Sequence, residues 1–234
     1  MKLLICAVLL AFSFSAQANF TLMPNVVCDW ELLNTGLSLV PTSAQLSRQL
    51  PLVRQDTNGK CGPSSLAIAL AHFGKIQATN FFDVYELSNL VTGLVHQTVS
   101  YNSSLEFWSN LYPPLQYPGV ALSLTLNAGP SLAETALRMG LFANSGIATL
   151  DQISQYVARQ EVVLVHWQAN LSQPLEQHWS AVQEINSLVV TLRDPWPTHP
   201  MANPLPILDF VRRATAGGLN RFHIVRVADH YLLP

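Results

Sequence analysis

The pattern of the chain changes from helical to strand-like after about residue 160, and this change limits the fold more than any other feature. Residues 161–167, EVVLVHW, are rich in β-branched side chains and predict a strand. Residues 178–185 and 188–193 read as two further strands separated by the turn residues Asn186-Ser187, which predicts a hairpin. Because a short turn joins antiparallel neighbours, the C-terminal half is expected to form an antiparallel sheet.

Helices are expected before this sheet. Residues 62–73 carry apolar side chains at helical spacing, with Pro63 in the first turn and Gly74 as a C-terminal stop. Helices followed by antiparallel strands define an α+β fold with an N-terminal helical half and a C-terminal sheet. Further elements are helices within residues 80–112, over 130–139, over 149–160 with Thr149 as cap, and over 207–216, one or two short helices within residues 19–54, and a last strand over 221–227.

The N-terminus has the pattern of a secretory signal. Lys2 precedes an apolar stretch, residues 3–14, and Ala16-Gln17-Ala18 is an A-x-A cleavage site. The apolar stretch is too short to span a bilayer stably. We therefore predict cleavage after Ala18, one mature domain over residues 19–234, and a periplasmic or secreted protein with no membrane association after signal removal.

Charged residues make up 11 % of the chain, where about 25 % is usual. The net charge is −2, and no run of like charge occurs. This composition argues against nucleic acid as a partner, because nucleic-acid binding depends on clustered positive charge. With 49 % apolar residues, the chain is expected to form a globular domain rather than a disordered one.

Two of the three cysteines, Cys28 and Cys61, remain after signal removal. In an exported protein two cysteines can form a disulfide, and a Cys28–Cys61 bridge would leave an inactive binding protein. If the thiols are free, Cys61 is a candidate nucleophile. No CxxC pair or His/Cys cluster indicates a metal, so neither a metal nor another cofactor is expected.

Cys61 stands where the helix over residues 62–73 begins. A thiol attacks as the thiolate, and helix N-termini and neighbouring imidazolium groups favour that form. Attack on a carbonyl also needs hydrogen-bond donors for the oxyanion. The side chain of Gln55, six residues upstream across a polar turn, is the candidate donor beside the Cys61 backbone N–H.

His178 and Asp194 complete the candidate constellation. His178 opens the first hairpin strand and Asp194 follows the second, so antiparallel pairing brings the imidazole and the carboxylate together. The histidine would be the general base and the aspartate would orient it. Each residue type alone is more often structural; the order of all four favours catalysis. Trp179, Trp196 and Arg193, next to these two residues, are candidate substrate contacts.

A glutamine, then CGxxS opening a helix, then a distant histidine and an aspartate at strand ends, resembles the papain-like cysteine peptidase clan. Within it the chain looks most like the phytochelatin synthase family, in its short exported bacterial form. The likeness covers about residues 50–228. It is carried by TLDQISQYVARQEVVLVHW (149–167), HWSAVQEINSLVVTLRDPW (178–196), the Pro-rich loop over 194–206, and ATAGGLNRFHIVRV (214–227).

The resemblance implies a papain-like fold and a thiol acyltransferase or hydrolase. Such proteins take the γ-Glu-Cys unit of glutathione onto the active-site thiol, release glycine, and pass the acyl group to water or to a second glutathione. We expect mainly hydrolysis here, because the chain carries no Cys-rich C-terminal extension, and a small thiol peptide such as glutathione as partner. Pro197 stands where the family usually carries an arginine for the substrate α-carboxylate, and Arg193 is a candidate replacement.

One further resemblance gives an alternative function. Bacteriocin-processing endopeptidases, which cleave leader peptides, share the spacing from the glutamine to the cysteine and a His…Asp-Pro hairpin. The alternative substrate is therefore a peptide or a protein.

Overall fold

An antiparallel sheet forms the core of the C-terminal half, as the strand-like runs predict. The computed structural model describes residues 43–57, 59–77, 83–101, 127–171, 177–196, 204–217 and 220–233. The sheet order is β2 (Phe142–Ala148), β7 (Phe222–Ala228), β3 (Val162–Gln168), β4 (Gln177–Ile185), β5 (Val189–Arg193) and β6 (Leu205–Pro206), and β1 (Ala44–Gln45) also pairs with β4. All seven of these strands pair antiparallel.

The predicted hairpin is present as β4 and β5. Asn186 closes its turn, because its Oδ1 accepts hydrogen bonds from the backbone N–H groups of Leu188 and Val189, each at 2.9 Å. Ala181 pairs with Arg193, so the start of β4 lies beside the end of β5. The hairpin therefore carries residues 178 and 194 to the same end of the sheet.

Helix α3 (Cys61–His72) is the central helix, and every residue from Cys61 to Leu70 is buried. A helix that is apolar or small on all sides is buried on all sides. Gly74 follows it with φ +68°, a conformation that glycine adopts without strain, and so ends the helix as predicted. Two buried serines fix its position: Ser64 bonds Ser88 at 2.6 Å, and Ser65 donates to the carbonyl of Trp179 at 2.9 Å.

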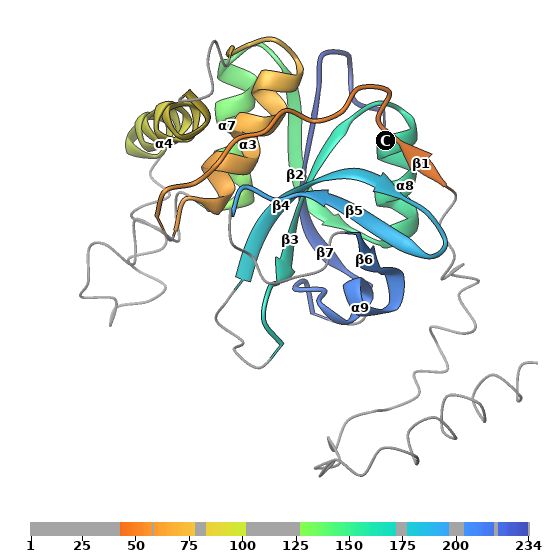
Figure 1. The fold of residues 1–234 in the computed structure, drawn as a ribbon. Helices are drawn as coiled ribbons and strands as arrows, with labels where there is room; N and C mark the ends of the chain where they lie inside the picture. Colours follow the sequence, from red (N-terminus) through yellow and green to blue (C-terminus); the bar gives the residue numbers. More distant parts are fainter. Residues whose placement is uncertain are drawn as a thin grey trace, which may run out of the picture. The chain divides into compact units, whose positions relative to one another are not determined.

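Helices α7 (Gly129–Arg138), α8 (Leu150–Ala158) and α9 (Ile207–Arg212) pack on the sheet, whereas α4 (Asp83–Tyr101) packs on other helices. Helix α4 packs on α3, and α7 packs on β2 and β7. In Figure 1 these three helices form a group away from α8 and α9. Thr149 caps α8 through a reciprocal capping box with Gln152, as the sequence predicts. A helical first half followed by a mainly antiparallel sheet confirms the predicted α+β class.

Three short or polar strands are absent from the sequence prediction, and β2 is the largest of them. Its sequence, FANSGIA, has no hydrophobic alternation, and most of its residues are exposed. It is a strand because its backbone pairs with β7 along its whole length, from Phe142–Ala228 to Ala148–Phe222. Edge strands of this kind are held by backbone hydrogen bonds to a neighbour, which no local pattern reveals.

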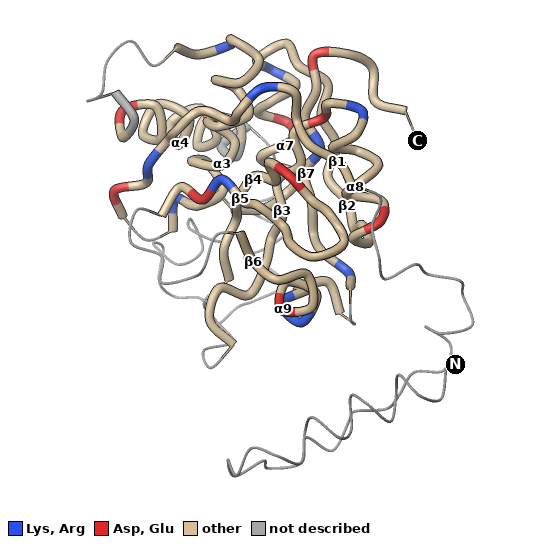
Figure 2. The backbone as a smooth tube through the Cα atoms, turned by 45° about the vertical axis from the view of Figure 1, so that its right-hand side comes forward, with Lys and Arg blue, Asp and Glu red and all other residues tan. Residues whose placement is uncertain are grey.

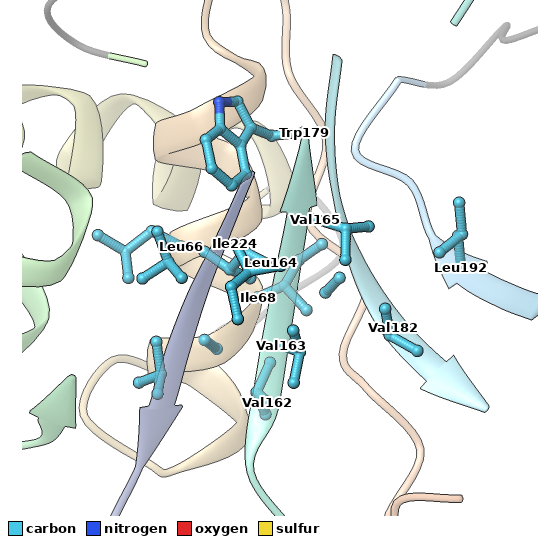
Figure 3. Close-up of a cluster of buried hydrophobic side chains, with 14 of the residues drawn as sticks. Leu66, Ile68, Val162, Val163, Leu164, Val165, Trp179, Val182, Leu192 and Ile224 are labelled. Carbon is cyan, nitrogen blue, oxygen red and sulfur yellow. The ribbon is translucent and has the colours of Figure 1, made fainter. Parts of the chain in front are cut away.

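The main core lies between α3 and the sheet. Leu66 and Ile68 of α3 point toward Leu164 of β3 and Ile224 of β7, and Trp179 lies at one end of this cluster (Figure 3). The first four residues of β3 are all fully buried, which explains their β-branched apolar composition. This packing holds the start of α3 and the start of β4 in a fixed relation.

All described residues belong to one unit, Ser38–Pro234. The few Lys, Arg, Asp and Glu residues are scattered along the chain (Figure 2). Within the described ranges, no helix combines the length and apolar character that crossing a membrane requires. The predicted signal peptide, residues 1–18, lies outside the described residues, as do Cys28, Pro197 and the end of the predicted 80–112 helical region. Of the segment 19–54, where one or two short helices were expected, residues 43–54 are described, and they contain strand β1 and no helix.

Candidate active site

Cys61 is the first residue of α3, so the thiol lies at the helix N-terminus, as the sequence predicts. The residue is 7 % exposed, and its thiol is free rather than in a disulfide. Its Sγ lies 3.3 Å from Oδ1 of Asn127. The positive end of the helix dipole at this place favours a negatively charged sulfur.

His178 and Asp194 meet at the same end of the sheet. Nε2 of His178 lies 2.7 Å from Oδ1 of Asp194, a short charge-assisted hydrogen bond. The backbone N–H of Trp196 donates to the same carboxylate oxygen at 2.8 Å. The carboxylate is therefore held from two sides, and the imidazole ring is oriented by it.

The His178 imidazole also forms a side-chain hydrogen bond with Cys61. With Nε2 bound to Asp194, Nδ1 is the ring nitrogen that remains for the thiol. Burial acts most strongly on His178 and lowers its pKa, but the hydrogen bonds and charges of Asp194 and Cys61 outweigh burial and raise the pKa to about 10. At neutral pH the ring is therefore an imidazolium beside the sulfur.

Gln55 lies in a segment that is tied to the Asp194 loop. Its backbone N–H donates to the carbonyl of Pro195 at 3.0 Å, and the Arg54 guanidinium donates to the carbonyl of Trp196 at 3.4 Å. The Gln55 side chain is buried, and its Nε2 donates to the carbonyl of Thr57 at 3.2 Å. Its Oε1 is buried without a hydrogen-bond partner among the described residues. The side-chain amide thus retains one further N–H for another acceptor.

The turn between Gln55 and Cys61 is also anchored at its outer side. Lys60 forms an ion pair with Asp56 at 2.8 Å and donates to Asn89 of α4 at 2.6 Å. The hydrogen bond from Lys60 is the main cause that lowers the pKa of Asp56. These contacts fix both ends of the turn.

The three predicted substrate contacts lie in different environments. Trp179 is only 2 % exposed, and its indole N–H donates to the backbone carbonyl of Asn127 at 2.9 Å. Trp196 is half-buried beside Asp194. Arg193 is half-buried, donates to the carbonyl of Pro51 at 3.1 Å, and has its pKa lowered by burial and by the neighbouring Arg54. Their contacts with substrate stay predictions.

Asn127 is a site residue that the sequence analysis misses. It lies two residues before the start of α7, and its Oδ1 also accepts the backbone N–H of Gly62 at 2.6 Å, while its Nδ2 donates to the carbonyl of Gly59 at 2.6 Å. A Cβ at position 62 would lie 2.6 Å from this oxygen, so only glycine fits after Cys61. No local signal joins residues 62 and 127, although a glycine directly after the cysteine is consistent with a close approach.

This arrangement is suited to nucleophilic chemistry. A thiol beside an imidazole can pass its proton to the ring, and a carboxylate on the other ring nitrogen stabilises the imidazolium. Across the described residues, no group of three or more His, Cys, Asp and Glu side chains is arranged to hold a metal ion.

Comparisons with known proteins give a likeness to solved structures but none to a family model or a curated protein. Among solved structures, a double-glycine motif protease from an AMS/PCAT transporter, solved in complex with its leader peptide, aligns with a TM-score of 0.45 and 15 % identity. The alignment covers 78 % of this chain and 97 % of the protease chain.

Proposed function

We propose that this protein is a papain-like thiol hydrolase or acyltransferase that cleaves an amide bond through a thioester on Cys61. The observation that carries the proposal is the meeting of Cys61, His178 and Asp194, which come from three separate elements. The imidazole contacts both the thiol and the carboxylate. A buried histidine with a strongly raised pKa beside a free thiol is typical of a catalytic pair.

In the proposed reaction His178 holds the proton that leaves the Cys61 sulfur. The thiolate attacks the substrate carbonyl carbon, and a C–S bond forms as the carbonyl oxygen takes the negative charge. The backbone N–H of Cys61 and the second N–H of the Gln55 amide donate to this oxygen. As the tetrahedral intermediate collapses, the C–N bond breaks and His178 protonates the leaving amine.

The second half of the reaction regenerates the thiol. His178, now neutral, removes a proton from water or from an acceptor nucleophile, which attacks the thioester carbonyl. The C–S bond breaks, and the sulfur again shares the proton with His178. Asp194 keeps Nε2 of the ring occupied throughout, so that Nδ1 performs each proton transfer.

Two substrates follow from the sequence resemblances. The first is glutathione or a related γ-glutamyl peptide, with release of glycine and mainly hydrolysis of the acyl-enzyme. The second is a longer peptide or a protein, cleaved as by a leader endopeptidase. The active-site chemistry is the same for both, so the test below includes both. Trp196 and Arg193 are the proposed substrate contacts.

The proposed place of action is outside the cytoplasm, in the periplasm or beyond. The support for this is the signal-like pattern of residues 1–18. Counting the free thiols of the mature protein shows whether Cys28 and Cys61 are oxidised to a disulfide, and so separates an enzyme from an inactive binding protein. Two free thiols agree with an enzyme, whereas none would mean a Cys28–Cys61 disulfide and a binding protein without thiol chemistry.

The decisive experiment traps the acyl-enzyme. The mature protein is incubated with glutathione in one sample and with a peptide mixture in another, quenched in acid, and examined by mass spectrometry. We expect an acyl adduct on Cys61, free glycine in the glutathione sample or new peptide termini in the other. Cys28→Ala is the matched control and keeps the adduct, while Cys61→Ala loses it. Absence of an adduct and of any product with both substrate classes would refute the proposed function.

A further inference from the structure

Asn127 lies against Cys61, which is the nucleophile if the proposed function holds. The side chain of Asn127 contacts the reacting sulfur, since Oδ1 lies 3.3 Å from Sγ. A side-chain amide can present either its oxygen or its nitrogen to a neighbour. Which of the two faces the sulfur decides whether Asn127 favours the thiol or the thiolate.

The hydrogen bonds around Asn127 settle this orientation. The backbone N–H of Gly62 needs an acceptor, which is Oδ1 at 2.6 Å. The carbonyl of Gly59 needs a donor, which is Nδ2 at 2.6 Å. Turning the amide over would place two donors against each other and two acceptors against each other, so the oxygen faces Cys61.

The backbone of Asn127 is fixed as well. The buried indole of Trp179 donates to its carbonyl at 2.9 Å, and Trp179 directly follows His178 in β4. Ser65 of α3 in turn donates to the carbonyl of Trp179 at 2.9 Å. The thiol, the imidazole and the amide oxygen are thus held in one rigid network.

The single thiol proton therefore has two neighbours with opposite effects. Asn127 offers an acceptor oxygen, which is favourable while the proton stays on sulfur and is repelled by a thiolate. His178 takes the proton and favours the thiolate. We propose that Asn127 is a further catalytic residue, whose amide oxygen competes with His178 for the thiol proton and so opposes thiolate formation.

This role has a chemical advantage. The nucleophilicity of a thiolate falls as the pKa of the corresponding thiol falls. An oxygen placed against the sulfur keeps the thiolate from being over-stabilised by the imidazolium and the helix N-terminus. It also occupies the Gly62 N–H, so that the Cys61 N–H and Gln55 are the donors left for the oxyanion.

The charged groups on the elements around the thiol form ion pairs or hydrogen bonds with identified residues. Among the described residues, His178 of β4 and, through it, Asp194 after β5 act on the thiol from the sheet side, and His166 of β3 interacts electrostatically with His178. Lys60 precedes the thiol but is paired with Asp56. On α7, Glu134 and Arg138 form an exposed ion pair with each other in the second half of the helix. On α4, Asn89 is the side chain joined to this turn.

The test measures the rate of Cys61 alkylation by iodoacetamide against pH, with mass spectrometry to separate Cys61 from Cys28. Asn127→Ala removes the oxygen and exposes the Gly62 N–H to the sulfur, so the midpoint of the profile moves to lower pH. Asn127→Asp places a negative charge there, so the midpoint moves to higher pH, by about one pH unit. Asn144→Asp, on exposed edge strand β2, is the matched control and leaves the midpoint unchanged.

The proposal predicts midpoint shifts in opposite directions for Asn127→Ala and Asn127→Asp. If Asn127 had only a structural role, the two midpoints would shift in the same direction or not at all. Shifts in the same direction, or no shift in either, would overturn the proposal. Should Asn127→Ala fail to fold by circular dichroism, Asn127→Ser removes the amide oxygen with a smaller cavity and is expected to shift the midpoint in the same direction. The alkylation test needs no substrate, so it is independent of the acyl-enzyme experiment. An absent acyl adduct refutes the proposed function, whereas the alkylation midpoints alone decide the role of Asn127.

Discussion

Two histidines lie on neighbouring strands of one sheet and have opposite electrostatic environments. His166 of β3 pairs with Trp179, the residue that follows His178 in β4. The pKa of His178 is raised to about 10, whereas burial, with the charges of His223 and His178, lowers the pKa of His166 to about 4. Near pH 7 one ring is therefore charged and the other neutral.

The difference comes from their partners rather than from their depth. The His178 ring bonds the carboxylate of Asp194, while the His166 ring lies tilted against the Trp179 ring, with centroids 4.9 Å apart, and 6.3 Å from the ring of His223. No carboxylate is paired with His166 among the described residues. A buried imidazole is charged where a carboxylate compensates for lost hydration, and neutral where none does.

The largest expected contrast is in catalysis. His178→Gln removes the proton acceptor and is expected to lower kcat/KM by about 10³-fold, within the usual range for a general acid–base group. His166→Gln keeps a polar side chain in the neighbouring strand and is expected to change kcat/KM by less than about 5-fold. Steady-state assays with the substrate that forms the acyl-enzyme compare the two variants. Equal losses would contradict the assignment of the base.

Asp194→Asn tests what makes the two histidines different. The variant loses the charge that stabilises the imidazolium, so the pKa of His178 falls and kcat/KM falls by about 10²-fold. Because the charge of His178 contributes to the low pKa of His166, the pKa of His166 rises as His178 becomes neutral. NMR titration of both imidazole rings measures this. Asp209→Asn, which removes the partner of Arg213 on α9, is the control and leaves both titrations unchanged.

Stability should fall on both sides of about pH 6.5, the pKa of an unfolded histidine. His166 is protonated in the unfolded chain but not in the folded one between pH 6.5 and 4, so acid lowers the free energy of unfolding, by at most about 3 kcal/mol. His178 holds its proton in the folded state, so its contribution is present below pH 6.5 and is lost as the pH rises through 10.

Urea unfolding at a series of pH values measures both sides of this profile. His166→Gln is expected to flatten the acid side and Asp194→Asn the alkaline side. An acid side that persists unchanged in His166→Gln would show that this histidine does not titrate as described.

The smallest expected effect concerns His223. Its ring lies near His166, and its charge is the second cause of the low pKa there, after burial. His223→Asn removes that charge, so the pKa of His166 rises by less than about one pH unit, while burial still holds it below 6.5. The NMR titration of His166 detects the change. A lower pKa of His166 in this variant would contradict the assigned cause.

Local patterns predicted most of the fold, and their failures have clear causes. The runs that became β3, β4, β5 and β7 are apolar and β-branched, and they were expected within one or two residues of their observed bounds. Strand β2 was not expected, because it is polar and mostly exposed. Residues 142–148 form a strand because their backbone pairs with β7, about eighty residues further along the chain.

In the candidate site, too, some features follow from local sequence and others from contacts between distant segments. The positions of Cys61 at a helix start and of His178 and Asp194 across one hairpin are local consequences of the sequence. The orientation of Asn127 toward the sulfur is not, because it depends on Gly59, Gly62 and Trp179 at once. An asparagine before a Gly-Pro helix start is an ordinary turn residue in the sequence.

The sequence by itself determined the elements, the hairpin and the identity of the nucleophile candidate, because helix starts and two-strand turns depend on residues that are neighbours in the chain. Only the tertiary structure decided the charge of each buried histidine and the atom that faces the thiol. These depend on which groups from distant segments replace water around a buried side chain, and that is fixed only when the helices pack against the sheet.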